Sequence, residues 1–224
     1  MPPKQARDPS NPILNNPYEE PRSHYATDQA GNLNYDDVRE GRRIFVTDTP
    51  TIPFAQRQPG MFDFNELASE WQDHLINLLR REVGAWRASR YAGVTSRVTR
   101  DLLDLWLLNP VREDRDKLFF AQQGAVETAI WLNEVAERSN AGTHLLSRLA
   151  QSQQTVSQTP AQVLPRMAFK MATGSGKTVV MACLILYHFL NRRQYRNDIR
   201  FPPRRANALR CAWSVSSARS QPKS

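Results

Sequence analysis

The chain has 224 residues, of which 40% are hydrophobic and 23% charged; this allows one domain, or one and part of another, and excludes disorder throughout. Its two cysteines exclude a disulfide framework and, with four histidines, match no zinc-site spacing, so we expect a reducing, cytoplasmic setting. The net charge of +8 is weak support for nucleic-acid binding, because six of the 30 basic residues follow Asp198, so residues 1–198 contain 24 basic residues and all 22 acidic ones.

Proline interrupts any regular pattern in the first 22 residues, where we expect a disordered or loosely docked arm. Met1–Asn16 lacks the apolar core of a signal peptide, and the longest apolar stretch, Thr178–Leu190, is shorter than the roughly 20 residues that span a bilayer. The sequence therefore predicts a soluble protein with no membrane partner. Further on, Arg42–Val46 is a candidate strand, and the prolines that follow it predict a loop.

The strongest helical signal begins at Asp63, which can cap a helix together with Glu66 three residues later. Apolar side chains then recur at steps of three and four residues, which is typical of one face of an amphipathic helix. They are Leu67, Trp71, Leu75, Leu78, Leu79, Val83 and Trp86. This spacing predicts a single helix that continues to Trp86.

The same periodicity predicts two further helices. One runs from about Thr95 to Leu108 and is stopped by Asn109-Pro110. Its inward positions are Val98, Leu102, Leu105 and Trp106. The other begins near Asp116 and ends around Asn140–Gly142, and its inward positions are Phe119, Phe120, Val126, Ile130 and Leu132.

Tryptophans at helical spacing are predicted core residues and not platforms for nucleic-acid bases; they are Trp71, Trp86, Trp106 and Trp131.

A change of pattern follows these helices. A short helix is predicted over Thr143–Ala150, and the stretch Gln151–Gln162, rich in Gln, Ser and Thr, predicts a linker. Arg166–Met171 then alternates in polarity as a strand does, and the apolar run Val179–Leu190 predicts a helix. Between them lies a glycine-rich loop, and this order of strand, loop and helix is the setting in which such a loop binds phosphate.

The loop reads Ala-Thr-Gly-Ser-Gly-Lys-Thr over 172–178. Two glycines allow the backbone N–H groups to point at one phosphate, and the start of the next helix adds the positive end of its dipole. Lys177 would supply a charge to the β and γ phosphates, and the Thr178 hydroxyl would ligate Mg²⁺. The sequence thus predicts a site for ATP and Mg²⁺, with Lys177 as the catalytic candidate, formed by Thr173, Gly174, Ser175, Gly176, Lys177 and Thr178.

The string Phe-Lys-Met-Ala-Thr-Gly-Ser-Gly-Lys-Thr over 169–178 resembles motif I of superfamily 2 helicases, specifically the Res subunit of type III restriction enzymes. That family favours Met at the position of Met171, where the general phosphate-loop pattern has Gly. The resemblance extends over about Phe119–Asn197, and less closely to Met61–Leu67. It implies a RecA-like ATP-binding domain, ATP-dependent translocation on or unwinding of duplex DNA, and a modification subunit as partner.

The segment Phe119–Val126 is similar to an aromatic-Gln segment that precedes motif I in that family. By this resemblance Gln122 would read the adenine edge, because a side-chain amide donates and accepts hydrogen bonds at once. The alternative is that Gln122 and Gln123 occupy an ordinary exposed helix face.

Hydrolysis needs further groups that the sequence does not show. The resemblance implies an Asp-Glu-x-His motif and an arginine from a second RecA-like domain, whereas no acidic motif appears in the 46 residues after Thr178. Where the next buried strand is expected, Pro202-Pro203 is followed by basic sequence. We therefore expect a truncated or frameshifted N-terminal piece of a longer helicase-like subunit. The alternative is a genuine basic tail that touches nucleic acid electrostatically.

These patterns together predict an α/β protein in which a mostly helical N-terminal region precedes the first strand, phosphate loop and helix of an incomplete RecA-like domain. The expected divisions are an arm over 1–22, a helical extension over 23–110, the start of the ATP-binding domain over 111–198 and a basic tail over 199–224. The predicted function is ATP-Mg binding in a DNA helicase or translocase of a restriction system, with little turnover by this chain alone. The alternatives are another P-loop NTPase, such as a nucleotide kinase, and a non-enzymatic interaction module with a vestigial loop.

Overall fold

The computed structural model describes residues 13–27, 33–45, 74–109, 111, 116–154, 169 and 171–201. Within these ranges the protein is mixed α/β and mostly helical, with five α-helices and one sheet of two strands. Contacts divide the chain into a unit that ends at Asn77 and a unit that begins at Leu78. None of the helices in the described ranges combines the length and apolar character that a membrane crossing requires.

The first unit contains an antiparallel β-hairpin made of β1 (Ser23–Thr27) and β2 (Leu33–Glu40). The ring of Tyr25 packs edge-on against the ring of Tyr35, with centroids 5.0 Å apart, and the strand pairing is irregular directly after Tyr25. Asn15, within the predicted arm, accepts hydrogen bonds from two backbone N–H groups at the start of β1 and donates to a carbonyl there. A side-chain amide therefore fixes the chain that leads into the hairpin.

The predicted strand Arg42–Val46 is wrong over its described residues, 42–45, which belong to no strand. The backbone N–H and carbonyl of Phe45 instead bond to the side-chain amide of Asn77, at 2.9 and 2.8 Å. Asn77 thus takes the place of a neighbouring strand at Phe45. The strands that do form have polar sequences without the apolar alternation that indicates a half-buried strand.

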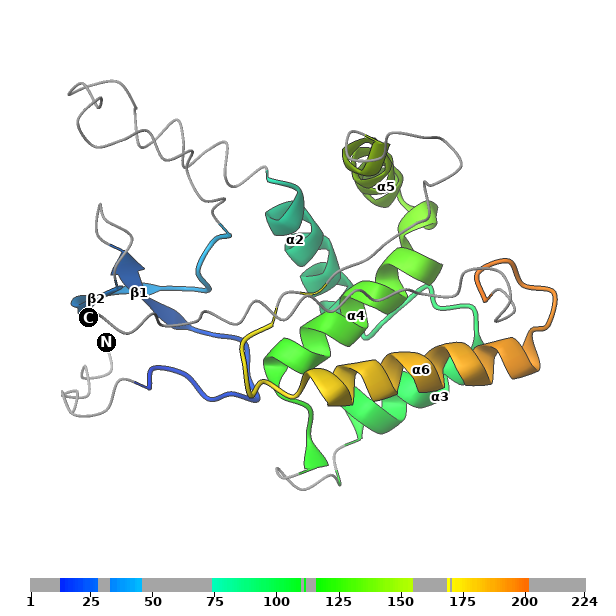
Figure 1. Ribbon diagram of the computed structural model, residues 1–224, viewed down its shortest axis with the longest axis horizontal. Coiled ribbons are helices and arrows are strands. Elements are labelled where there is room, and N and C mark those ends of the chain that lie inside the picture. Colours follow the sequence, from blue (N-terminus) through cyan, green and yellow to red (C-terminus); the bar gives the residue numbers. More distant parts are fainter. Residues whose placement is uncertain are drawn as a thin grey trace, which may run out of the picture. The chain divides into compact units, whose positions relative to one another are not determined.

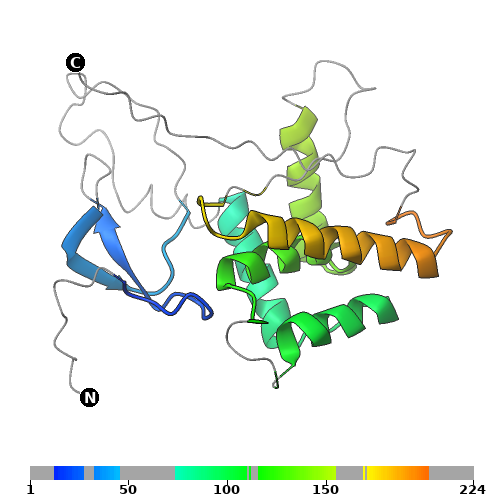
Figure 2. The same ribbon diagram turned by 60° about the horizontal axis from the view of Figure 1, so that its bottom comes forward.

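The second unit is helical and packs around one long helix, which follows the glycine-rich loop. The helices are α2 (Leu75–Ala88), α3 (Arg97–Leu103), α4 (Phe120–Glu134), α5 (Asn140–Gln154) and α6 (Lys177–Gln194). Helix α2 begins just before the unit boundary, and α3 continues as a π-helical turn over Asp104–Leu108. Helix α6 lies against α4 and α3, as both views of the ribbon show (Figures 1 and 2).

Most of the predicted helices are confirmed, with shifted ends. The first predicted helix is present as α2, where Val83 and Trp86 are buried, whereas its expected start at Asp63 lies outside the described residues. The second is present as α3 and its π-helical turn, but Leu105 is 52% exposed and Leu103 is buried instead. Leu105 falls beside the buried stripe because successive helical residues turn by about 100°. That stripe consists of Thr99, Leu102, Leu103 and Trp106.

The third predicted helix, α4, ends at Glu134 and not near Asn140, because a 3₁₀ turn over Ala136–Arg138 separates it from α5. Helix α5 then continues to Gln154, so the first four residues of the predicted linker are helical. Residues 151–154 contain no glycine or proline, and three of them are glutamine, which is a good helix former. Of the predicted core tryptophans, Trp86, Trp106 and Trp131 are buried, and Trp71 lies outside the described residues.

Three helices meet around a set of buried polar side chains, which we call the polar cluster: Ser96 and Thr99 of α3 with its N-cap, Glu134 of α4, and Tyr187 and Asn191 of α6. The Oε1 atom of Glu134 accepts hydrogen bonds from the hydroxyls of Thr99, at 2.6 Å, and Tyr187, at 2.8 Å. Asn191 donates to the Thr99 oxygen at 3.0 Å and also bonds the Ser96 hydroxyl. Burial, and then the charge of Glu134, raise the pKa of Tyr187, which keeps this hydroxyl a donor.

A second buried carboxylate joins α2 to α4. Glu127 is fully buried, and Arg87 donates to both of its oxygens, at 2.9 and 2.5 Å. Tyr91 and Gln123 donate to the same carboxylate at 2.7 and 2.8 Å. Because a buried charge is tolerated only when it is paired and hydrogen-bonded, this arrangement fixes the crossing of the two helices.

The chain after α6 folds back on that helix. Phe201 is buried against the rings of Tyr187 and His188. Arg200 forms a two-pronged ion pair with Asp198 and donates to the Thr95 hydroxyl. Residues 202–224, most of the predicted basic tail, lie outside the described residues.

We expect Glu134→Ala to lower the free energy of unfolding by about 1–3 kcal/mol, because it leaves the buried hydroxyls of Thr99 and Tyr187 without their acceptor. Urea unfolding measures this loss. Glu137→Ala removes an exposed acid just beyond the end of α4 and serves as the control, which should change stability by less than about 0.5 kcal/mol. Equal losses for the two variants would show that the polar cluster does not hold the helices together.

Burial lowers the pKa of His188 to about 4 from 6.5, so the unfolded chain binds more protons than the folded chain between these values. We therefore expect the free energy of unfolding to fall as the pH falls through this window, by at most about 1.4 kcal/mol per pH unit. His188→Phe keeps a ring against Tyr187 and Phe201 but does not titrate. Urea unfolding at several pH values between 4 and 6.5 should show that the free energy of unfolding depends less steeply on pH in this variant than in the wild type. An equal dependence on pH in the two proteins would contradict a lowered pKa for His188.

Candidate functional site

The glycine-rich loop has the backbone conformation that its two glycines permit. Gly174 and Gly176 have φ values of +78° and +75°, in the left-handed region that side chains with a Cβ rarely adopt. Gly176 is the N-cap of α6, whose first helical residue is Lys177. The predicted helix after the loop is therefore confirmed, and it begins two residues before the apolar run that signalled it.

The predicted strand before the loop, Arg166–Met171, is described at only two of its residues. Phe169 and Met171 are described and belong to no strand, whereas residues 166–168 and 170 lie outside the described residues. Within the part of the chain that is described, the loop is thus positioned by α6 and by its contact with α4, and not by a parallel sheet.

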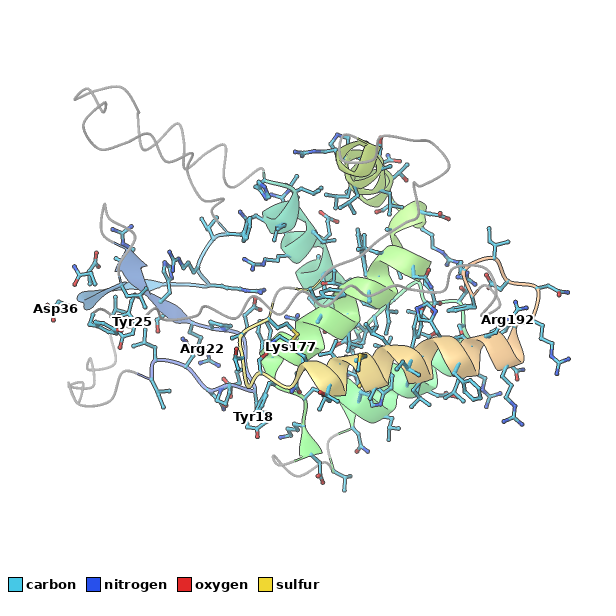
Figure 3. All side chains as sticks on the ribbon, in the orientation of Figure 1. Tyr18, Arg22, Tyr25, Asp36, Lys177 and Arg192 are labelled. Carbon is cyan, nitrogen blue, oxygen red and sulfur yellow. The ribbon has the colours of Figure 1, made fainter. Side chains whose placement is uncertain are left out.

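The Ala172 carbonyl organises the inside of the loop. It accepts hydrogen bonds from the Ser175 hydroxyl at 2.7 Å, from the Ser175 backbone N–H at 3.3 Å and from the Lys177 amine at 2.7 Å. The lysine therefore bends back over the loop from the first turn of α6, where Figure 3 labels it. Sequence reasoning missed the part played by Ala172, because a backbone carbonyl gives no signal in the residue type.

The start of α6 presents backbone donors that have no acceptor among the described residues. Among the described residues, no acceptor pairs with the backbone N–H groups of Gly176, Lys177 and Thr178. The first N–H groups of every helix lack an intrahelical partner. In α6 the first turn carries no acidic side chain that would compete with an anion for these donors. With the dipole of an 18-residue helix behind them, they form an arrangement suited to a phosphate group.

The structure brings Gln122 to the loop from α4. Its Nε2 donates to the Ser175 carbonyl at 3.1 Å, and its Oε1 accepts from the Phe119 N–H at 3.0 Å, which caps α4. The residue is only 5% exposed, so the alternative of an ordinary exposed helix face is wrong for Gln122. The neighbouring Gln123 points elsewhere, to Glu127 and Tyr91.

The other predicted site residues lie at the surface. Thr173, Gly174 and Thr178 are exposed, and Ser175 and Lys177 are partly exposed. Thr178 is thus exposed at the start of α6, and its hydroxyl is a group that could ligate a divalent cation there.

Acidic residues are sparse in the described stretch that contains the loop and α6. The one acid in the stretch 171–201 is Asp198, and its carboxylate pairs with Arg200, which holds its pKa below the usual value. No group of three or more His, Cys, Asp or Glu side chains in the described ranges could hold a metal ion.

We expect Gly176→Ala to destabilise the protein more than Gly174→Ala. Both substitutions force a Cβ into the left-handed region, at a cost of roughly 1–2 kcal/mol. At Gly176 the added Cβ would also overlap the Gln122 amide, whereas nothing lies near a Cβ at Gly174. Urea unfolding of both variants measures the difference.

The cause of the extra loss can be checked in a Gln122→Ala background. There the overlap is absent, so Gly176→Ala should cost about as much as Gly174→Ala. An unchanged difference between the two glycine variants would show that Gln122 does not pack against Gly176.

The chain was compared with protein-family models, with curated proteins and with solved structures, and none of them matches it.

Proposed function

We propose that the chain binds ATP together with Mg²⁺ at the loop formed by Thr173, Gly174, Ser175, Gly176, Lys177 and Thr178. The observation that carries this proposal is the loop itself, in which two left-handed glycines lead directly into unpaired N–H donors at the start of α6. An anion is the ligand that such donors favour. The lysine amine, already bent over the loop, adds the positive charge that a triphosphate needs.

Each group has a defined task in this proposal. The N–H groups of Gly176, Lys177 and Thr178 would donate to phosphate oxygens, and the Lys177 amine would leave the Ala172 carbonyl to pair with the β and γ phosphates. The Thr178 hydroxyl would ligate the Mg²⁺ ion, which would supply positive charge to offset that of the phosphates when it is bound. The exchange of a neutral carbonyl for a charged phosphate favours the movement of the lysine.

The larger activity that we propose is that of an ATP-dependent DNA helicase or translocase of a restriction system, with a RecA-like ATP-binding domain acting on duplex DNA beside a modification subunit. Support comes from the resemblance of the string over 169–178 to motif I of the type III Res subunit. Hydrolysis also needs an acid that orients water, and Asp198, engaged by Arg200, is a poor candidate. We therefore propose nucleotide binding, with little turnover, as the activity of this chain by itself.

One observation favours a second candidate, a non-enzymatic interaction module. Helix α6 exposes large apolar side chains on the face opposite its buried one: Met181, Ile185, Leu186 and Phe189 are 39–59% exposed. Contiguous apolar surface of this kind is typical of an interaction site. The two candidates differ in whether ATP stabilises the fold, since only a ligand that binds the folded chain does so.

We expect ATP-Mg to raise the unfolding temperature of the wild type, and Lys177→Ala to weaken ATP binding about 10- to 100-fold, because charged hydrogen bonds to phosphate contribute about 1.5–3 kcal/mol. Arg193→Ala is the matched control, since it removes an exposed positive charge near the other end of α6, about 24 Å away along the helix. Calorimetric titration measures the affinities.

No thermal shift for the wild type would favour the interaction module. A wild type that binds ATP together with a Lys177→Ala variant of equal affinity would place the nucleotide elsewhere in the chain.

A further inference from the structure

Gln122 has its side-chain amide engaged at both ends by the protein itself. Oε1 accepts the Phe119 N–H and Nε2 donates to the Ser175 carbonyl. An amide retains one further lone pair and one further N–H, but a residue that is only 5% exposed does not present them to a ligand base. To read adenine, Gln122 would have to give up the cap of α4, the contact with the loop, or both.

The contact with Ser175 determines where a neighbouring donor points. A peptide unit is planar and trans, so the carbonyl of Ser175 and the N–H of Gly176 lie in one plane and point in opposite directions. Because Gln122 holds this carbonyl toward α4, the Gly176 N–H is directed away from α4. That N–H is one of the unpaired donors at the start of α6.

The close approach of Gly176 to Gln122 reinforces this orientation. A Cβ at Gly176 would overlap the Nε2 atom of Gln122, so the glycine backbone packs directly against the amide. The left-handed φ of Gly176 makes the sharp turn from the held carbonyl into α6. One buried side chain therefore fixes both the turn and the peptide plane of the loop.

We propose that Gln122 is a positioning residue for the phosphate loop, which sets the Gly176 N–H to face a triphosphate, and that it does not select the base. This inference rests on the proposed nucleotide site. It separates two effects, because a residue that orients the loop supports binding of any triphosphate, whereas a residue that reads adenine supports binding of ATP alone.

The experiment compares three probes on the full chain with Mg²⁺ present: ATP, GTP and inorganic tripolyphosphate, which has no base. Gln122→Met removes the contact with Ser175 at similar side-chain volume. We expect it to weaken all three probes by a similar factor, about tenfold, which is the effect of one well-made hydrogen bond at the upper end of its usual range. Calorimetric titration measures the three affinities, and thermal unfolding without ligand reports whether the variant is folded.

Two further variants exclude a general loss of structure. Gln123→Met makes the same change one residue later, where the side chain contacts Glu127 and Tyr91, and it should leave all three affinities within about twofold of the wild type. Gln122→Glu keeps an acceptor for the Phe119 N–H but cannot donate to the Ser175 carbonyl. If the loop contact matters, Gln122→Glu weakens all three probes at least as much as Gln122→Met; if only the cap of α4 mattered, it would bind like the wild type.

The outcomes are distinct. A Gln122→Met variant that weakens ATP alone and binds tripolyphosphate normally would overturn the inference and keep the nucleotide site. So would a variant that binds all three probes as the wild type does, or a Gln122→Glu variant with wild-type affinities. A wild type that binds none of the three would overturn the nucleotide site, and the inference with it.

Discussion

Helix α6 is held in register by buried hydrogen bonds, and the position of the loop depends on that register. Apolar contacts alone are non-directional and would tolerate a helix that slides or turns. The Glu134 carboxylate, buried on α4, accepts from Thr99 of α3 and Tyr187 of α6, and Asn191 bonds the same threonine. Since the loss of buried hydrogen bonds is costly, these bonds favour one arrangement of the three helices, and that arrangement decides the position in space of the first turn of α6.

The two contacts between α4 and α6 are matched in spacing. Gln122 meets Ser175 at the start of the two helices, and Glu134 meets Tyr187 further along. Both pairs of positions are 12 residues apart in sequence, which is about 18 Å along α4, and Ser175 lies two residues before the first helical residue of α6. The two helices therefore run in the same direction, tied at two points by side chains that point across the interface. A displacement of α4 would therefore disturb the hydrogen bonds of both the polar cluster and the phosphate loop.

Helix α6 is apolar on two faces, of which the described residues cover one. Cys183, Leu184 and Tyr187 are buried against the other helices, while Ile185 and Phe189 are 59% and 51% exposed. A helix that is apolar all round is typical of the interior of a larger layered structure, which agrees with the proposed RecA-like setting. It agrees equally with a surface that binds another protein, so the response to ATP is what separates the two proposals.

The sequence by itself determined the parts that depend on local chemistry. Glycines at 174 and 176 predicted a curled loop, the apolar periodicity of α2, α3 and α4 predicted those helices, and an apolar run predicted α6, because all these signals depend on neighbours in the chain. Only the tertiary structure decided which polar residues are buried. Nothing local distinguishes Glu127 or Glu134 from an exposed acid, and the hydrogen-bond donors to these two carboxylates, apart from Gln123, lie 35–53 residues away in sequence.

The same reason explains why the strand prediction was wrong and why the sequence does not fix the contacts of Gln122. Arg42–Val46 has the pattern of a strand, but strands need a partner, and Phe45 found the side chain of Asn77 instead. Gln122 could be placed near the loop by resemblance, yet whether its amide faces a base or the protein depends on how α4 packs against Ser175. A residue type limits the hydrogen bonds that a side chain can make, and the fold chooses among them.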